Sequence, residues 1–184
     1  MKLKELEIVN TSQKLYDSFN GFILSPDTKV FGKLLARTLL AEQVKDLPGD
    51  IVECGVFKGT GMLTFLKLKR FLCPNSGKKV VGFDFFDSEA LIDSLSGIDK
   101  EAMNTLFCER EYKHDRNHVL LFRDFVRQCG FEEHEFELVA GDITETAAKY
   151  VSERPGFRIS LLYIDLDVDI PTYEALKAMW GRVV

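Results

Sequence analysis

Short apolar runs alternate with longer segments of helical periodicity along most of this chain. The apolar runs predict buried strands, expected at residues 51–56, 79–84, 136–140 and 158–164. The segments with apolar residues three and four positions apart predict helices, expected at residues 28–47, 59–71, 118–129, 144–151 and 171–180. Alternating strands and helices are typical of a parallel sheet covered on both faces. We therefore expect an α/β fold with a doubly wound parallel sheet.

Two segments do not follow this pattern. Residues 85–117 are mostly polar, with one short helix expected near residues 99–107, and a stretch of this kind is typical of a lid or a surface insertion. Residues 1–27 form an N-terminal segment without a clear pattern. Together with the rest of the chain they are expected to belong to a single domain, residues 1–184.

Composition and charge narrow the classes of partner. The 184 residues are 46% hydrophobic and 29% charged, with 24 Lys and Arg against 29 Asp and Glu, and a net charge of −5 makes nucleic acid an unfavourable partner. No window approaches the roughly 20 apolar residues of a membrane span, and no signal peptide is expected. The four cysteines are widely spaced and mostly in apolar surroundings, which indicates buried free thiols in a reducing compartment. We expect a cytoplasmic protein that binds a small molecule.

A glycine-rich turn follows the first predicted strand. Gly55, Gly59 and Gly61 separate this strand from the next helix, and glycines at such a turn allow a ligand to approach the backbone closely. Their spacing matches neither the dinucleotide fingerprint nor the phosphate loop, so a dinucleotide-dependent oxidoreductase is disfavoured. A strand, a glycine turn and a helix are also common in plain α/β architecture, and this alternative stays open.

Acidic residues stand at the end of every predicted strand: Glu53, Asp84, Asp142, and Asp165 with Asp167. Ligands of doubly wound sheets bind beyond these carboxyl ends. Any one of these acids could simply cap the following helix, but acids at all four strand ends together favour a ligand-binding site. Asp84 has the geometry to accept both hydroxyls of a ribose, and Asp142 could accept the exocyclic amine of an adenine. Phe57 could cover the base, although aromatic residues around a sheet more often belong to the core.

Three segments, residues 47–59, 81–87 and 162–176, resemble the class I S-adenosylmethionine-dependent methyltransferases, and within them the macrocin O-methyltransferase family. The last segment is the most specific, because the family has Asp-x-Asp, here Asp165 and Asp167, followed by a Pro-Thr helix start, here Pro171 and Thr172. The resemblance covers residues 28–184 except 85–117. It implies a Rossmann-like fold and the transfer of a methyl group to a sugar hydroxyl.

The resemblance also implies roles for individual residues. The cofactor-binding residues implied for S-adenosylmethionine are Glu53, Gly55, Phe57, Gly59, Thr60, Asp84 and Asp142. Glu53 and Gly55 would hold the methionine part of the cofactor. Asp84 would bind the ribose, and Asp142 would lie on the adenine side.

Further roles implied by the resemblance concern the chemistry. Asp165 would be catalytic and would bind a divalent metal, with Asp167 as a second ligand, and such hard carboxylates suit Mg²⁺. The family uses a histidine as general base. Of the histidines in this chain, His114 is favoured over His118 and His134 for that role.

The sequence departs from the family at its end. Where the family continues with a fifth strand ending in an acidic pair and a final hairpin, this sequence ends at Val184. We therefore expect a sheet that lacks its last strands, an incomplete metal site, and an uncovered sheet edge through which the chain could form a homo-oligomer. The alternative to a sugar O-methyltransferase is a non-catalytic, truncated binding or assembly module.

Overall fold

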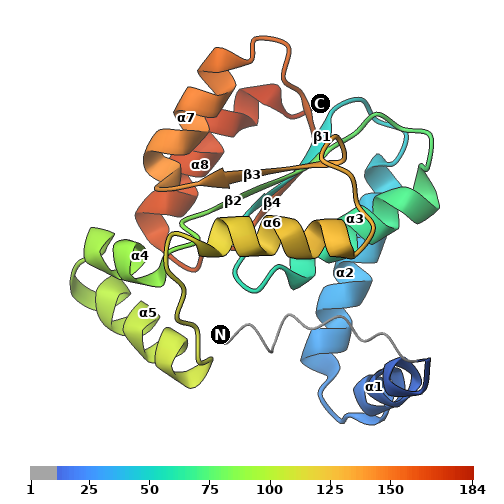
Figure 1. The fold of residues 1–184 in the computed structure, drawn as a ribbon. Helices are drawn as coiled ribbons and strands as arrows, with labels where there is room; N and C mark the ends of the chain where they lie inside the picture. Colours follow the sequence, from blue (N-terminus) through green and yellow to red (C-terminus); the bar gives the residue numbers. More distant parts are fainter. Residues whose placement is uncertain (1–11) are drawn as a thin grey trace.

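The centre of the molecule is a parallel sheet. The computed structural model describes residues 12–184, and their strands run in the order β3-β2-β1-β4 (Figure 1). The strands are β1 (Asp50–Cys54), β2 (Val80–Asp84), β3 (Phe136–Ala140) and β4 (Ile159–Ile164). At the end of β1, Cys54 pairs with Phe83 of β2 on one side and with Ile164 of β4 on the other. Because the chain moves outward from β1 to β3 and then crosses back beyond β1, the topological switch point lies between β1 and β4.

Helices connect the strands at the positions that the periodicity predicts. The helices are α1 (Ser12–Leu24), α2 (Thr28–Val44), α3 (Thr60–Leu72), α4 (Ser88–Ser94), α5 (Gly97–Glu109), α6 (His118–Gln128), α7 (Ile143–Glu153) and α8 (Asp169–Met179), followed by the 3₁₀ turn Trp180–Arg182. The five long helices predicted from the sequence are confirmed to within a few residues. Helices α1 and α4 were not predicted.

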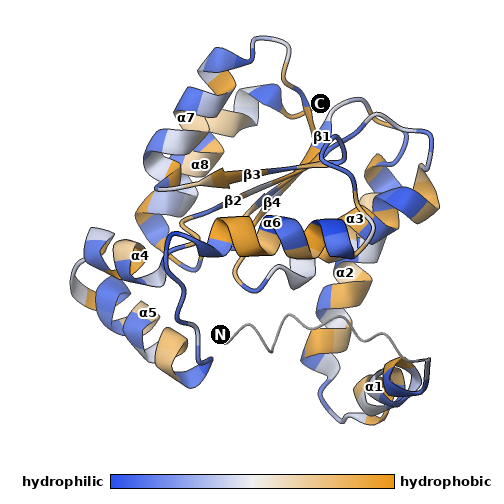
Figure 2. Ribbon diagram, in the orientation of Figure 1, coloured by the Kyte–Doolittle hydropathy of each residue, from blue (hydrophilic) through white to orange (hydrophobic). Residues whose placement is uncertain are grey.

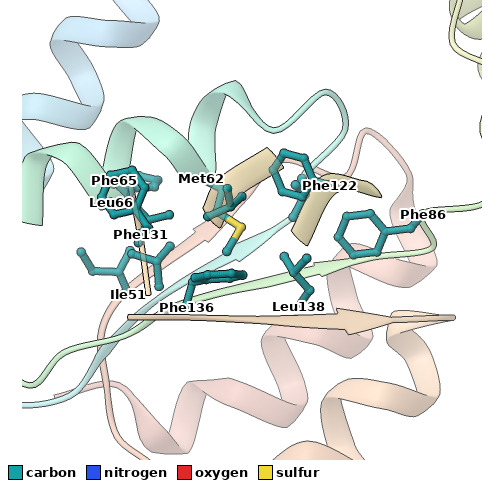
Figure 3. Packing of buried hydrophobic residues seen from close by; sticks show 12 residues of the cluster. Ile51, Met62, Phe65, Leu66, Phe86, Phe122, Phe131, Phe136 and Leu138 are labelled. Carbon is teal, nitrogen blue, oxygen red and sulfur yellow. The ribbon is translucent and has the colours of Figure 1, made fainter. Parts of the chain in front are cut away.

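The two faces of the sheet carry separate apolar clusters. On one face, α3 and α6 bury Met62, Phe65 and Phe122 against β1, β2 and β3 (Figure 3). On the other face, α7 and α8 bury residues such as Tyr150 and Met179. Figure 2 shows hydrophobic and hydrophilic residues alternating along α6. Its residues Phe122 and Val126 are buried in the cluster over the sheet, as expected of an amphipathic helix. The doubly wound arrangement is confirmed.

The predicted lid or insertion, residues 85–117, contains α4 and α5. Met103 and Phe107 of α5 form a third apolar cluster with Tyr112 and Val168, and Phe57 of the glycine turn packs against it. The Phe57 and Tyr112 rings stack with their centroids 4.4 Å apart. The insertion therefore packs at the carboxyl ends of the strands.

Helix α1 and the start of α2 extend away from the sheet (Figures 1 and 2). Their exposed large apolar residues are Leu15, Tyr16, Phe19, Ile23, Leu24, Val30, Phe31, Leu34, Leu35 and Leu39. Among residues 12–184, none of the helices has the length and apolar character needed to cross a membrane. All four cysteines are free thiols, as predicted, but the expected burial is wrong for three of them: Cys54 is buried, Cys73 and Cys129 are half-buried, and Cys108 is exposed.

Strand β4 is the last strand on its side of the sheet within the described residues. Its outer edge carries one parallel bridge, between Ile159 and Val183, and the N–H of Val184 donates to the Ile159 carbonyl at 3.1 Å. The remainder of the β4 edge is not paired with any strand of residues 12–184, as expected from the sequence.

Candidate functional site

The glycine turn after β1 is shaped by its neighbours. A Cβ at Gly55 would collide with the carbonyl oxygen of Asp165, and the backbone there is left-handed, with φ of 94°. Gly59 is also left-handed, with φ of 83°, and a Cβ there would strike the Phe122 ring. A Cβ at Gly61 would overlap the Glu53 carboxylate. Packing alone thus accounts for all three glycines, so their spacing by itself is no evidence for a ligand.

Asp84 at the end of β2 joins two strand ends. Its Oδ2 accepts a hydrogen bond of 2.8 Å from the N–H of Phe57, and its Oδ1 accepts one of 2.9 Å from the N–H of Phe86. Both donors are in the left-handed region, with φ of 51° and 53°. Burial raises the pKa of Asp84, while the N–H groups of Phe86 and Phe57, and less strongly those of Val56 and Phe85, oppose the rise. Each carboxylate oxygen has a further lone pair, so Asp84 can still accept hydroxyl groups of a ligand.

Asp142, expected on the adenine side, caps α7. Its Oδ1 accepts hydrogen bonds from the N–H of Thr144 at 2.9 Å and from the Thr144 hydroxyl at 2.8 Å. The capping alternative considered for a strand-end acid is therefore confirmed at this position. A contact with adenine stays a prediction.

Four charged side chains meet where β1 and β4 end beside α2. We call Lys33, Arg37, Glu53 and Asp165 the α2 charge cluster. The Nη2 of Arg37 lies 3.6 Å from Glu53 Oε1 and 3.8 Å from Asp165 Oδ2, and the Nζ of Lys33 lies 3.8 Å from the same Asp165 oxygen. The Arg37 guanidinium also lies over the Tyr163 ring, 4.9 Å from its centroid. Each acid of the cluster therefore lies near at least one cation.

The most buried member of the α2 charge cluster is Glu53, whose side chain is 1% exposed. Burial raises the pKa of Glu53 to about 8, against the opposing effect of the Arg37 charge. Its Oε2 and the Nε of Arg37 are buried without a hydrogen-bond partner. A buried polar atom without a partner is uncommon, so these two atoms need an explanation.

The expected metal ligands do not form a metal site in the part of the chain that is described. Asp167 is exposed and has left-handed backbone, with φ of 59°, whereas Asp165 lies beside the two cations of the α2 charge cluster. Residues 12–184 contain no group of three or more His, Cys, Asp or Glu side chains placed to hold an ion. The donor set present does not fit Mg²⁺, and we assign no step to a metal.

His114, expected as the general base, lies inside an aromatic stack. Its ring stacks on that of His118 with the centroids 3.5 Å apart and the planes 21° from parallel, and it forms a T-shaped contact with the Tyr112 ring. The residue is 7% exposed, and its Nε2 is buried without a partner. Burial, reinforced by His118, lowers the pKa of His114 to about 3. This geometry favours a packing role, since such a weakly basic nitrogen takes up a proton poorly at neutral pH.

Of the remaining expected residues, Thr60 is exposed at the start of α3 and Phe57 is half-buried beneath Tyr112. The sequence reasoning missed Lys33 and Arg37. The signal available was an arginine within an apolar helical stretch, one turn before the buried Ala41. A charged residue on the buried face of a helix is uncommon unless it has a partner.

Comparisons with known proteins give the class of fold. No family model matches the chain, and a search of curated proteins found no match. A structure of CalS11, described as a calicheamicin methyltransferase, matches with a TM-score of 0.72 and 24% identity, over 100% of this chain and 72% of that chain. At this identity the likeness concerns the fold. The chain has a Rossmann-like methyltransferase fold, as predicted.

Two further solved structures match the same fold. The apo structure of CalS11, there described as TDP-rhamnose 3′-O-methyltransferase, an enzyme in calicheamicin biosynthesis, matches with a TM-score of 0.67, 24% identity and the same coverage. The O-methyltransferase NovP matches with a TM-score of 0.62 and 18% identity, over 82% of this chain and 60% of that chain. The three matches thus come from two different methyltransferases.

Proposed function

We propose that this protein is an S-adenosylmethionine-dependent O-methyltransferase that acts on a hydroxyl of a sugar-containing small molecule. The observation that carries the proposal is Asp84. In a methyltransferase fold, this carboxylate lies at the end of the strand beside the glycine turn, held by two N–H donors, with lone pairs left for two hydroxyls. That arrangement suits the ribose of a nucleoside.

The rest of the cofactor would extend from Asp84 over the carboxyl ends of the strands. Glu53 and the turn of Gly55, Gly59 and Thr60 lie toward β1, where the methionine part is proposed to bind. Asp142 at the end of β3 is proposed for the adenine side. Phe57 lies between these regions, with its ring held by Tyr112.

When bound, the cofactor supplies an electrophilic methyl group. The protein's own contribution is to hold the acceptor hydroxyl in line with that group and to exclude water, which the packing of α4 and α5 at the strand ends supports. A sugar acceptor is proposed because CalS11, which matches this whole chain in fold, is described as acting on TDP-rhamnose.

Calorimetric titration with S-adenosylhomocysteine tests the proposal. We expect saturable 1:1 binding that Asp84→Ala weakens by at least about tenfold, the effect of losing hydrogen bonds to a charged group. Asp124→Ala on α6, an exposed acid, is the matched control and should bind like the wild type. A folded protein that binds NAD but not S-adenosylhomocysteine would refute the proposal.

A non-catalytic binding module is the second candidate. It is favoured by the burial of His114 Nε2, the ring nitrogen of the histidine expected as general base. Methyl transfer from radiolabelled S-adenosylmethionine to TDP-rhamnose and related nucleotide sugars separates the two. Binding without transfer to any of these acceptors would favour the module.

A further inference from the structure

Tyr112 of the insertion packs directly onto the glycine turn. The residue is 3% exposed, and its ring stacks on the Phe57 ring with the centroids 4.4 Å apart and the planes 28° from parallel. Its hydroxyl lies 3.5 Å from the Phe57 carbonyl oxygen, at the limit of a hydrogen bond. Burial raises the pKa of Tyr112, and the negative charge of nearby Asp84 adds to the rise. Tyr112 therefore reaches the region proposed for the ribose.

Phe57 is held from two sides. Asp84 Oδ2 accepts a hydrogen bond from its backbone N–H, and Tyr112 covers its ring. Its backbone is left-handed, with φ of 51°, and a bulky residue keeps such a conformation only where the surrounding structure enforces it. The carboxylate that holds Phe57 is also the proposed ribose acceptor. The position of Phe57 therefore links the ligand site to the insertion.

The part of the insertion around Tyr112 is also strained and fastened to the turn. We call residues 110–114 the Tyr112 segment. Lys58 Nζ donates a hydrogen bond of 2.9 Å to the Arg110 carbonyl, and Glu111 has left-handed backbone, with φ of 50°. Strained residues of this kind cluster at ligand clamps and are kept in place by their surroundings. The ring contact thus joins two strained segments, one on each side of it.

We propose that Tyr112 is a positioning residue that couples ligand binding at Asp84 to the packing of the insertion. This inference rests on the proposed function. A ribose at Asp84 needs the carboxylate and the turn in their described positions, and Tyr112 holds the turn through the Phe57 ring. Because coupling between two sites is reciprocal, a ligand bound at Asp84 stabilises the Tyr112 segment against opening. The ring carries this effect, since the hydroxyl makes at most a weak hydrogen bond.

Calorimetric titration of the purified protein with S-adenosylhomocysteine is the first test. Tyr112→Leu should weaken binding about fivefold, the usual contribution of a stacked aromatic pair. Tyr112→Phe keeps the ring and should bind like the wild type. Phe157→Leu is the matched control, because Phe157 is a buried ring just before the start of β4, at the opposite end of the strands. It should lower stability and leave the affinity unchanged.

Hydrogen exchange measures the reciprocal effect. Saturating S-adenosylhomocysteine should slow amide exchange in α5 and the Tyr112 segment of the wild type and of Tyr112→Phe. In Tyr112→Leu, with its fold checked by circular dichroism, this ligand-dependent protection should be lost. A merely structural role for Tyr112 would lower stability in the leucine variant without removing the protection.

Two results would overturn the coupling while the proposed function stands. The first is a Tyr112→Leu variant with wild-type affinity and wild-type protection. The second is a wild type that binds S-adenosylhomocysteine with no change of exchange in the insertion, a measurement that remains decisive even if Tyr112→Leu does not fold. A folded wild type that does not bind S-adenosylhomocysteine would overturn both the coupling and the proposed function.

Discussion

The carboxylate of Asp84 accepts a hydrogen bond of 2.8 Å from the backbone N–H of Phe57, 27 residues earlier in the chain. This bond links the end of β2 to the glycine turn after β1. It also holds Phe57 in a left-handed conformation that a bulky residue rarely adopts. Asp84 therefore shapes the turn as well as presenting acceptors to a ligand.

Asp84→Asn should affect stability and binding together. An amide oxygen can replace one of the two accepting oxygens, but the NH₂ group then faces an N–H donor. We expect the free energy of unfolding to fall by about 1–3 kcal/mol, the usual effect of leaving a buried donor without an acceptor. Urea denaturation measures this value, with Asp124→Asn as the control. Unchanged stability would mean that Phe57 keeps its conformation without Asp84.

Asp142→Ala should act mainly on stability. Loss of the α7 cap is expected to lower the free energy of unfolding by about 1 kcal/mol, and Asp142→Ser should restore most of it, because serine is also a good cap. Thermal unfolding provides the measurement. A loss of S-adenosylhomocysteine affinity in both variants, at unchanged stability, would instead support the adenine contact.

The pH dependence of stability should report the buried carboxyl of Glu53. Its pKa is raised from 4.5 to about 8, so between these values the native protein keeps a proton that the unfolded chain has lost. Stability should therefore fall as pH rises through this window, by up to about 1.4 kcal/mol per pH unit. Below pH 4.5 Glu53 is protonated in both states and contributes no slope.

Glu53→Gln should remove this slope, so the variant gains stability relative to the wild type as pH rises. Denaturation at several pH values provides the test, with Glu101→Gln on the exposed face of α5 as the control. Parallel curves for Glu53→Gln and the wild type would contradict the assignment of the proton to Glu53.

His114→Phe should retain methyl transfer to within about threefold, because the aromatic packing is preserved and the buried nitrogen is a weak base. His134→Phe, at an exposed position, is the control. The measurement is turnover with whichever acceptor proves active. A fall of about 100-fold or more, the size of a lost general base, would restore the catalytic role expected from the sequence.

Much of the fold could be predicted from the sequence, because buried strands and amphipathic helices leave periodic signals. The strand at residues 136–140 and the helix from His118 are at their predicted positions. Helix α1 escaped prediction because none of its residues is buried, so packing imposes no pattern on it. Cytoplasmic localisation and self-association stay predictions.

The site was harder to predict. The acids at the strand ends were found because strand ends can be located along the sequence. Whether an acid meets a cation depends on side chains distant in sequence: Arg37 and Glu53 are separated by 15 residues. The burial of His114 could not be foreseen, since it arises from stacking on His118 and packing against Tyr112.

The close contact between Glu53 and Gly61 makes these two positions interdependent. The Glu53 carboxylate occupies the place that a Cβ at residue 61 would take. A mutant library that varies residue 61 alone should therefore return mostly glycine. One that also shortens residue 53 should accept alanine at residue 61, with a small shift of the Arg37 guanidinium, whose Nη2 lies 2.8 Å from that Cβ position. Any redesign around this turn has to treat the two residues as a single choice.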